Sequence, residues 1–229
     1  MQHILRALLL TTGVGLVQQY SFAQDKTQGQ IHYEIVYHVH ASLKPDQMQY
    51  KDLIPESVIE KAELIYKGQR LKAYFNDEVK KEEDGVSSSI KVATDDGNER
   101  YVDLDKKTLW WVDKTKNPAV LVEKAVFEQD KDSDKEVEHP DTKKILDYNC
   151  RKLTFKSKDG MRTIWYTTEL PLKAGTPLGQ FTDKGVILGL ESKKMSFTAT
   201  SIDFVPVAED IITPPADLKI VKTGDHKGK

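Results

Sequence analysis

The chain has 229 residues, enough for one or two domains of ordinary size. Hydrophobic residues make up 38% of it and charged residues 31%, which is typical of a globular protein and excludes a collagen-like or wholly disordered chain. The 34 basic residues nearly balance the 36 acidic ones, so the composition does not indicate a nucleic-acid-binding protein. A single cysteine excludes a disulfide-rich scaffold and a cysteine-based zinc module.

The first 23 residues have the pattern of a secretory signal peptide. Arg6 supplies a positive charge, an apolar run from Ala7 to Val17 follows, and Ser21 and Ala23 are small residues suited to a cleavage site. The apolar run is shorter than the roughly 20 residues that cross a bilayer. We expect cleavage after Ala23 and a periplasmic or secreted protein without a transmembrane segment. The alternative is a buried N-terminal helix.

Alternation of apolar and polar residues predicts a single β-rich domain over residues 24–222. Between Gln30 and His40, for example, Ile31, Tyr33 and Ile35 share one face of a strand. The short turns between such segments predict an antiparallel sheet rather than βαβ units, which need long crossover helices. The further expected strands are 62–66, 71–75, 86–94, 100–104, 108–112, 119–127, 149–155, 162–168, 186–190 and 195–205.

Few helices are expected in this β-rich chain. Short helices are predicted at 45–53, 56–62 and 142–146, partly from proline and acidic residues at their starts. Residues 129–139 are densely charged and lack the glycine of a calcium-binding loop, which favours a mobile surface loop. Residues 223–229 are expected to form a disordered tail.

Some predicted strands carry apolar residues on both faces. A sheet with one solvated face does not need this pattern, so we expect either covering segments on the second face or a sheet that curls around a core or cavity. Large apolar side chains would line such a cavity, unless they simply fill the core. The candidates are Trp110, Trp111, Trp165, Tyr166, Leu121 and Phe127.

The stretch from Thr142 to Val221 contains a recognisable pattern, TKKILDYNCRKLTF followed by WYTTELP. It resembles the GLPGLI-type group of secreted proteins from outer-membrane bacteria and related domains of unknown function. The resemblance implies a fold similar to the periplasmic lipoprotein carriers LolA and LolB, a strongly curved antiparallel half-barrel of about ten strands with a few short helices. It implies no catalytic residues. The matching residues are Lys143, Lys144, Ile145, Leu146, Tyr148, Cys150, Lys152, Trp165, Tyr166, Thr167, Leu170 and Pro171.

Two further features could carry chemistry. His32, His38 and His40 fall on one face of the first predicted strand, and imidazole binds zinc or copper. A solvated strand face is the favoured explanation, because no second group of ligands accompanies them. Cys150 lies in a predicted strand without an evident partner base, so we expect a small buried residue. No cofactor is expected.

The sequence contains no phosphate-binding glycine loop, nucleophile elbow or paired-histidine zinc motif. We therefore expect a non-enzymatic protein that holds a hydrophobic ligand, such as a lipid or acyl chain, in a cavity of the curved sheet. One alternative is a structural module that docks a partner protein at the cell envelope. The other is a metal-dependent enzyme that uses His32, His38 and His40.

Overall fold

The computed structural model describes residues 25–75, 78–83, 86–91, 98–126, 136–157, 160–173, 175, 177, 179 and 182–223. For 78–83 and 86–91 it describes the backbone alone. The expected signal peptide, Phe127, most of the expected charged loop and all but the first residue of the expected tail lie outside these residues.

Twelve strands form one mixed sheet in the order β14-β8-β7-β6-β3-β2-β1-β13-β12-β11-β10-β9. All neighbours are antiparallel except β14 and β8, which are parallel. The edge strands β14 and β9 do not pair with each other, so the sheet is not closed into a barrel. The strands are β1 (Gln28–His38), β2 (Ser57–Lys67), β3 (Arg70–Phe75), β6 (Glu99–Asp103), β7 (Thr108–Asp113), β8 (Val120–Ala125), β9 (Val137–Ile145), β10 (Tyr148–Ser157), β11 (Gly160–Thr167), β12 (Val186–Ser192), β13 (Met195–Asp203) and β14 (Lys219–Lys222).

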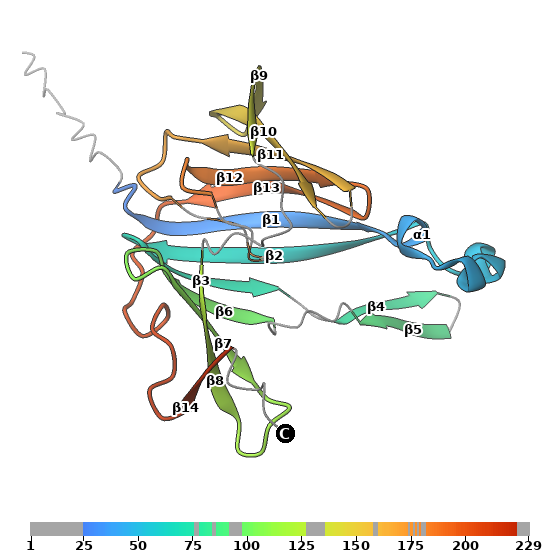
Figure 1. The fold of residues 1–229 in the computed structure, drawn as a ribbon, viewed down its shortest axis with the longest axis horizontal. Coiled ribbons are helices and arrows are strands. Elements are labelled where there is room, and N and C mark those ends of the chain that lie inside the picture. Colours follow the sequence, from blue (N-terminus) through green and yellow to red (C-terminus); the bar gives the residue numbers. More distant parts are fainter. Residues whose placement is uncertain are drawn as a thin grey trace, which may run out of the picture.

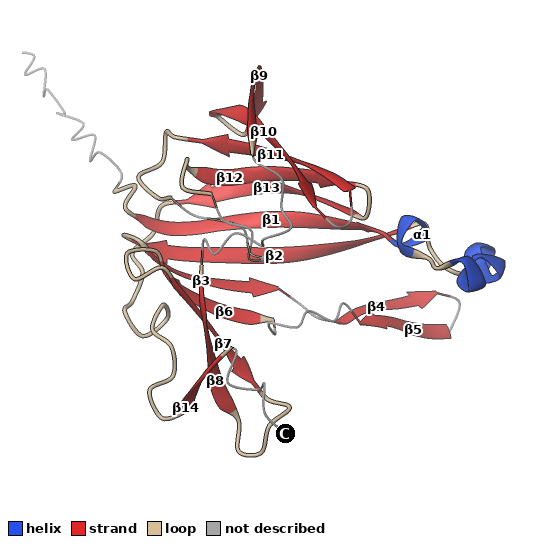
Figure 2. Cartoon of the chain, in the orientation of Figure 1, coloured by secondary structure: helices blue, strands red, loops and turns tan. Residues whose placement is uncertain are grey.

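The sheet twists strongly from its centre to its edges. In Figure 1, β1 and β2 run across the middle of the molecule, while β8 and β9 near its two ends run steeply across that direction. The strands β4 (Glu78–Glu83) and β5 (Val86–Lys91) form a separate hairpin. Among the described residues the helices are confined to the connection between β1 and β2, where α1 (Val39–Ser42) and the 3₁₀ helix η1 (Pro45–Leu53) lie (Figure 2).

The core is built from apolar side chains that meet across neighbouring strands. Directly paired residues share a face of the sheet, so the pairing aligns one row across β1, β13, β12, β11 and β10. The Tyr33 ring packs edge-on against one member of this row, with the ring centroids 5.7 Å apart. The row consists of Ile35, Phe197, Leu190, Ile164 and Leu153, all at most 2% exposed.

The segment between β11 and β12 packs against this core. Leu170 and Leu172 belong to the hydrophobic cluster and are 4% and 1% exposed. The Gln69 side-chain amide donates a hydrogen bond to the Pro171 carbonyl at 3.0 Å. On the sheet, Arg100 donates from Nη1 to the Pro177 carbonyl at 3.3 Å. Leu170 and Leu172 therefore extend the hydrophobic core beyond the strands of the sheet.

The prediction of a mainly β domain with few helices is confirmed, as is the short helix at 45–53. The sheet has twelve strands rather than about ten, and it is mixed rather than wholly antiparallel. The helix predicted at 56–62 is wrong, because residues 57–62 belong to β2, where the buried Glu60 interrupts the apolar alternation. The helix predicted at 142–146 is also wrong, because most of these residues form the exposed edge strand β9.

Residues 137–139 of the expected loop also belong to β9. The strands β4, β9 and β14 were not anticipated, and each carries few apolar residues in alternation. No described helix has the length and apolar character needed to cross a membrane.

Candidate functional site

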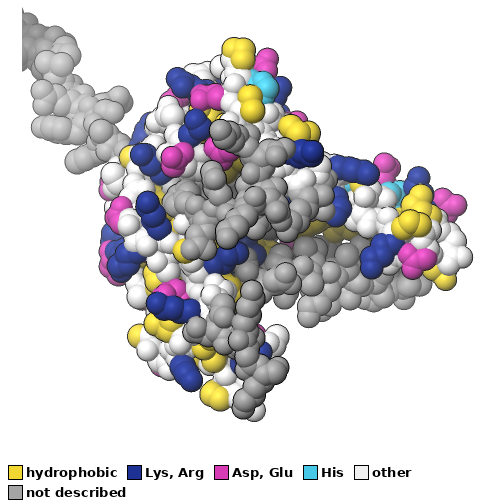
Figure 3. All heavy atoms as spheres, viewed as in Figure 1, with side chains coloured by type: hydrophobic (Ala, Val, Ile, Leu, Met, Phe, Trp, Pro, Cys, Tyr) yellow, Lys and Arg dark blue, Asp and Glu magenta, His cyan; other side chains and the backbone are white. Residues whose placement is uncertain are grey.

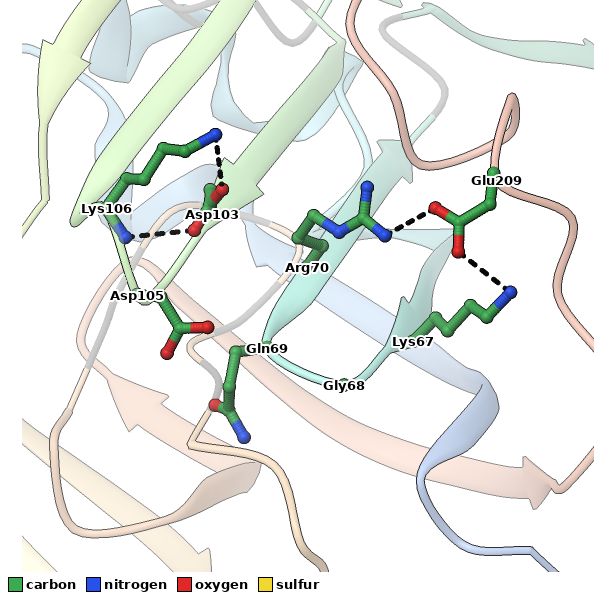
Figure 4. A pocket seen from close by; sticks show the side chains of 8 residues that line it. All are labelled: Lys67, Gly68, Gln69, Arg70, Asp103, Asp105, Lys106 and Glu209. Atoms are coloured by element: carbon green, nitrogen blue, oxygen red, sulfur yellow. Dashed lines mark hydrogen bonds and ion pairs between the residues drawn. The ribbon is translucent and has the colours of Figure 1, made fainter.

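An open pocket of about 520 Å³, lined mainly by charged residues, lies where the turn between β2 and β3 approaches the turn between β6 and β7 (Figure 4). Its volume is within the range of small-molecule sites, roughly 300–1,000 Å³. Its lining contains charged groups of both signs and no aromatic ring. The lining residues are Lys67, Gly68, Gln69, Arg70, Asp103, Asp105, Lys106 and Glu209.

A tight turn places two of the cations next to each other. Lys67 ends β2 and Arg70 begins β3, and the two residues are paired across the hairpin. Gly68 makes the turn with a φ of 59°, in the left-handed region that glycine adopts without steric cost. The paired positions put the Lys67 ammonium and the Arg70 guanidinium on the same rim of the pocket (Figure 4).

Glu209 reaches these cations from the chain that follows β13. Its carboxylate accepts a hydrogen bond from Arg70 Nη2 and lies 2.9 Å from Lys67 Nζ. The hydrogen bonds from Lys67 and Arg70 hold the pKa of Glu209 below its ordinary value. Val207 and Ile212, which are 4% and 2% exposed, anchor the chain on either side of Glu209.

The opposite rim carries the remaining charges. Asp103, at the end of β6, accepts hydrogen bonds from the Lys106 backbone N–H at 2.9 Å and faces the Lys106 ammonium at 3.2 Å. Burial opposes ionisation of Asp103, but these bonds outweigh it and hold its pKa below the ordinary value. Asp103 is only 7% exposed, so the exposed Asp105 is the carboxylate that this rim presents beside the Lys106 ammonium.

The three histidines predicted as metal candidates do not converge. His32 lies between two carboxylates, with Nδ1 3.3 Å from Glu63 and Nε2 3.4 Å from Asp203. His38 is six positions further along β1, about 20 Å away at 3.3 Å per residue. His40 lies in α1, with Nε2 3.0 Å from the Ile54 carbonyl. In the part of the chain that the structure describes, no three His, Cys, Asp or Glu side chains are placed to hold a metal ion.

The five predicted cavity residues that the structure describes are distributed over the core and the partly exposed surface, and none of them lines the pocket. Trp111, Tyr166 and Leu121 are buried at 7%, 2% and 3% exposure. The other two tryptophans are half-buried, and their indole N–H groups donate hydrogen bonds to carboxylates. Trp110 donates to Glu123 at 3.0 Å, and Trp165 donates to Glu191 at 3.2 Å.

Cys150 is fully buried, and burial raises the pKa of its thiol to about 11. This environment disfavours the thiolate that a nucleophile requires.

Sequence reasoning missed the pocket because its residues lie in segments interpreted as connections. The available signal was the density of charge in two connections between predicted strands, Lys67 to Arg70 and Asp105 to Lys107. Nothing in the sequence indicates that Glu209, far along the chain, joins the first of these turns.

The fold and the pocket define a domain built on one extended mixed β-sheet, with a pocket whose rims carry charged residues. The model of one family, described as "N-glycanase peptide, N-terminal domain", matches residues 99–218. This match covers more than half of the chain, and the protein belongs to that family.

Two solved structures of PNGF-II have a similar fold. The structure in the C2 space group is 15% identical, with a TM-score of 0.56 over 85% of this chain and 30% of that chain. The structure in the P21 space group is 14% identical, with a TM-score of 0.56 over 86% of this chain and 31% of that chain. The protein therefore spans about a third of the length of these relatives. No curated protein sequence matches it.

These comparisons correct the resemblance inferred from residues 142–221. The GLPGLI-type assignment and the implied LolA- or LolB-like carrier fold are wrong, because the matching family and structures are those of N-glycanase relatives. The hypothesis of a protein that holds a lipid or acyl chain is wrong for the same reason. The two alternatives, an envelope docking module and a histidine-based metal enzyme, receive no support from the comparisons.

The region matched by the family model, residues 99–218, does not coincide with a unit that can form the sheet by itself. Residues 99–218 begin at β6, but β3, β2 and β1 lie between β6 and β13 in the sheet. Without these central strands the matched region would form two separate groups of strands. The complete sheet therefore depends on residues outside the match.

Proposed function

We propose that this protein is a secreted, non-enzymatic module that binds N-glycosylated proteins. The observation that carries the proposal is its membership in a family of N-terminal domains of N-glycanases. A domain that accompanies an N-glycanase meets the same glycosylated polypeptides as the catalytic part of the enzyme. Binding of those polypeptides is the simplest role for such a domain.

The pocket supports a polar ligand rather than an apolar one. Carboxylate, ammonium and guanidinium groups line it, and together they can accept and donate hydrogen bonds to sugar hydroxyls. Four lining residues, Asp103, Asp105, Lys106 and Glu209, lie within the matched family region. The other four belong to the β2–β3 hairpin, outside that region.

Secretion is proposed from the N-terminal pattern of a positive charge, a short apolar run and small residues at 21 and 23. The absence of a catalytic role is proposed from the lack of a recognised catalytic motif in the sequence. The proposal also includes a trough-like shape for the sheet, supported by the steep crossing of β8 and β9 relative to β1 in Figure 1.

Binding and catalysis can be measured on the same samples. The protein from residue 24 onward is immobilised, and an N-glycoprotein is applied before and after enzymatic removal of its N-glycans. We expect binding of the glycosylated form only, and no release of glycans in mass spectra of the incubated glycoprotein. Equal binding of both forms would contradict glycan recognition, and glycan release would show that the protein is an enzyme.

Export is tested separately. Expression of the full chain in an outer-membrane bacterium should yield a periplasmic or secreted protein whose N-terminal residue is Gln24. An intact N-terminus on a protein that stays inside the cell would contradict secretion.

A further inference from the structure

We propose that the Lys67–Arg70 pair is a binding site for a carboxylate-bearing sugar, and that the Glu209 carboxylate competes with the sugar for it. This inference rests on the proposed function and specifies which N-glycans the pocket favours. It also assigns Glu209 the role of an internal competitor for the ligand.

The geometry of the pair fits a carboxylate. Arg70 offers a planar fork of N–H donors and Lys67 an ammonium group, and both are directed at one carboxylate in Figure 4. An Arg fork recognises a carboxylate with defined orientation, while Lys adds a point charge. The site therefore already binds the chemical group that we assign to the ligand.

Glu209 is not needed to hold its own segment in place. Val207 and Ile212 are buried on either side of it. The Val207 backbone N–H donates to Gln28 at 3.0 Å, and its carbonyl accepts from Lys67 Nζ at 3.1 Å. The segment keeps these contacts when the Glu209 side chain turns away.

Displacement of the Glu209 carboxylate costs little. The side chains of Lys67, Arg70 and Glu209 are 36%, 41% and 55% exposed, and ion pairs at such positions contribute little to stability. A ligand carboxylate can therefore take the place of Glu209, provided that the rest of the ligand gains further contacts in the pocket.

The charges are distributed unevenly along the pocket. Lys67 and Arg70 share one carboxylate at the first rim, whereas Asp103 and Asp105 accompany one ammonium at the second. The first rim thus favours an anionic group and the second offers acceptors for hydroxyl groups. A sugar with a carboxylate at one end and hydroxyls along its length, such as sialic acid, matches this distribution.

The test compares three forms of one N-glycoprotein: sialylated, treated with sialidase, and freed of its N-glycans. Affinities are measured by biolayer interferometry for the wild type, Glu209→Gln, Arg70→Gln and the control Glu191→Gln. Glu191 is matched to Glu209, since it is also 55% exposed and pairs with a lysine, Lys143, at 3.2 Å. Circular dichroism confirms that each variant is folded.

We expect the wild type to bind the sialylated form about fivefold or more tightly than the sialidase-treated form. Arg70→Gln should abolish this preference by weakening binding of the sialylated form more than binding of the sialidase-treated form. Glu209→Gln should raise affinity for the sialylated form by about three- to tenfold. The substitution removes a competing carboxylate, and the gain reflects the modest strength of the exposed ion pairs that this carboxylate makes. Glu191→Gln should change nothing, and added salt should weaken the preference.

The outcomes separate the two proposals. Equal binding of the sialylated and sialidase-treated forms, with weaker binding of the glycan-free form, would overturn the carboxylate site and leave the proposed function standing. Equal binding of all three forms would overturn the proposed function itself. An equal gain from Glu209→Gln and Glu191→Gln would overturn the role of Glu209, since it would reflect net charge alone.

Discussion

Replacement of Tyr33 by phenylalanine tests a hydrogen bond that reaches across the centre of the sheet. The Tyr33 hydroxyl, on β1, donates to the Ile187 carbonyl of β12 at 3.0 Å, although β13 lies between the two strands. Tyr33 is 1% exposed and Ile187 is 0% exposed. Burial raises the pKa of Tyr33 well above its ordinary value, so the hydroxyl remains a donor at neutral and mildly alkaline pH.

Tyr33→Phe should lower the free energy of unfolding by about 1–2 kcal/mol, since a buried carbonyl loses its donor while the ring still fills its space. Tyr37→Phe is the matched control, because the Tyr37 hydroxyl has no hydrogen-bond partner among the described residues. Its loss should change stability by less than about 0.5 kcal/mol, or increase it.

Urea denaturation followed by tryptophan fluorescence measures both variants, with the dependence on urea concentration unchanged from wild type. A loss of equal size in the two variants would refute this interpretation of the Tyr33 hydrogen bond, as would an unaffected Tyr33→Phe.

Three further predictions concern a core side chain, two glycines and the buried thiol. Phe197→Ala removes a ring that is 2% exposed and should cost about 3–5 kcal/mol in urea denaturation; a loss below 1 kcal/mol would contradict the packing described. Gly185→Ala places a Cβ 2.2 Å from the Thr167 carbonyl oxygen, whereas Gly68→Ala meets open space at a φ of 59°. The first should lower the thermal midpoint more than the second, which costs about 1–2 kcal/mol, and the reverse order would disprove the close approach. Cys150, with its pKa raised to about 11 by burial, should react with Ellman's reagent at pH 8 only in urea, and a rapid reaction of the native protein would show that it is accessible.

Among the strands that were predicted correctly, β1 and β3 alternate buried residues with more exposed ones, whereas β6 and β12 are recognised by short runs that are buried almost throughout. In β3, for example, Leu71, Ala73 and Phe75 are buried and the residues between them are not. The apolar–polar alternation of the sequence fails where a polar residue is buried, as at Glu60 in β2, or where an edge strand buries almost nothing, as in β9. Apolar–polar alternation in the sequence indicates which face of a strand is buried. The strands β2 and β9 depart from it because one buries a polar residue and the other is exposed.

The order of strands and the pocket depend on contacts between distant residues. Nothing local to β3 indicates that β6, rather than β4, lies beside it, or that β1 joins β2 to β13. The pocket also depends on residues that are distant in the sequence, because Glu209 contacts Lys67 and Arg70 only when β13 is in place. Composition and turn chemistry indicated two charged turns, but their juxtaposition is a property of the complete sheet.

The pairing of β1 with β13 sets the order in which the chain can complete its fold. Gln30 is paired with Asp203, so β1, near the beginning of the chain, can complete its pairing only when β13, near the end of the chain, is available. Until residues 195–203 emerge from the ribosome, β1 presents an open strand edge to other chains. Contacts between such distant residues slow folding, and a partly synthesised chain with an open edge is prone to aggregation. Chaperones that hold the nascent polypeptide extended would protect it until the last third of the chain is made.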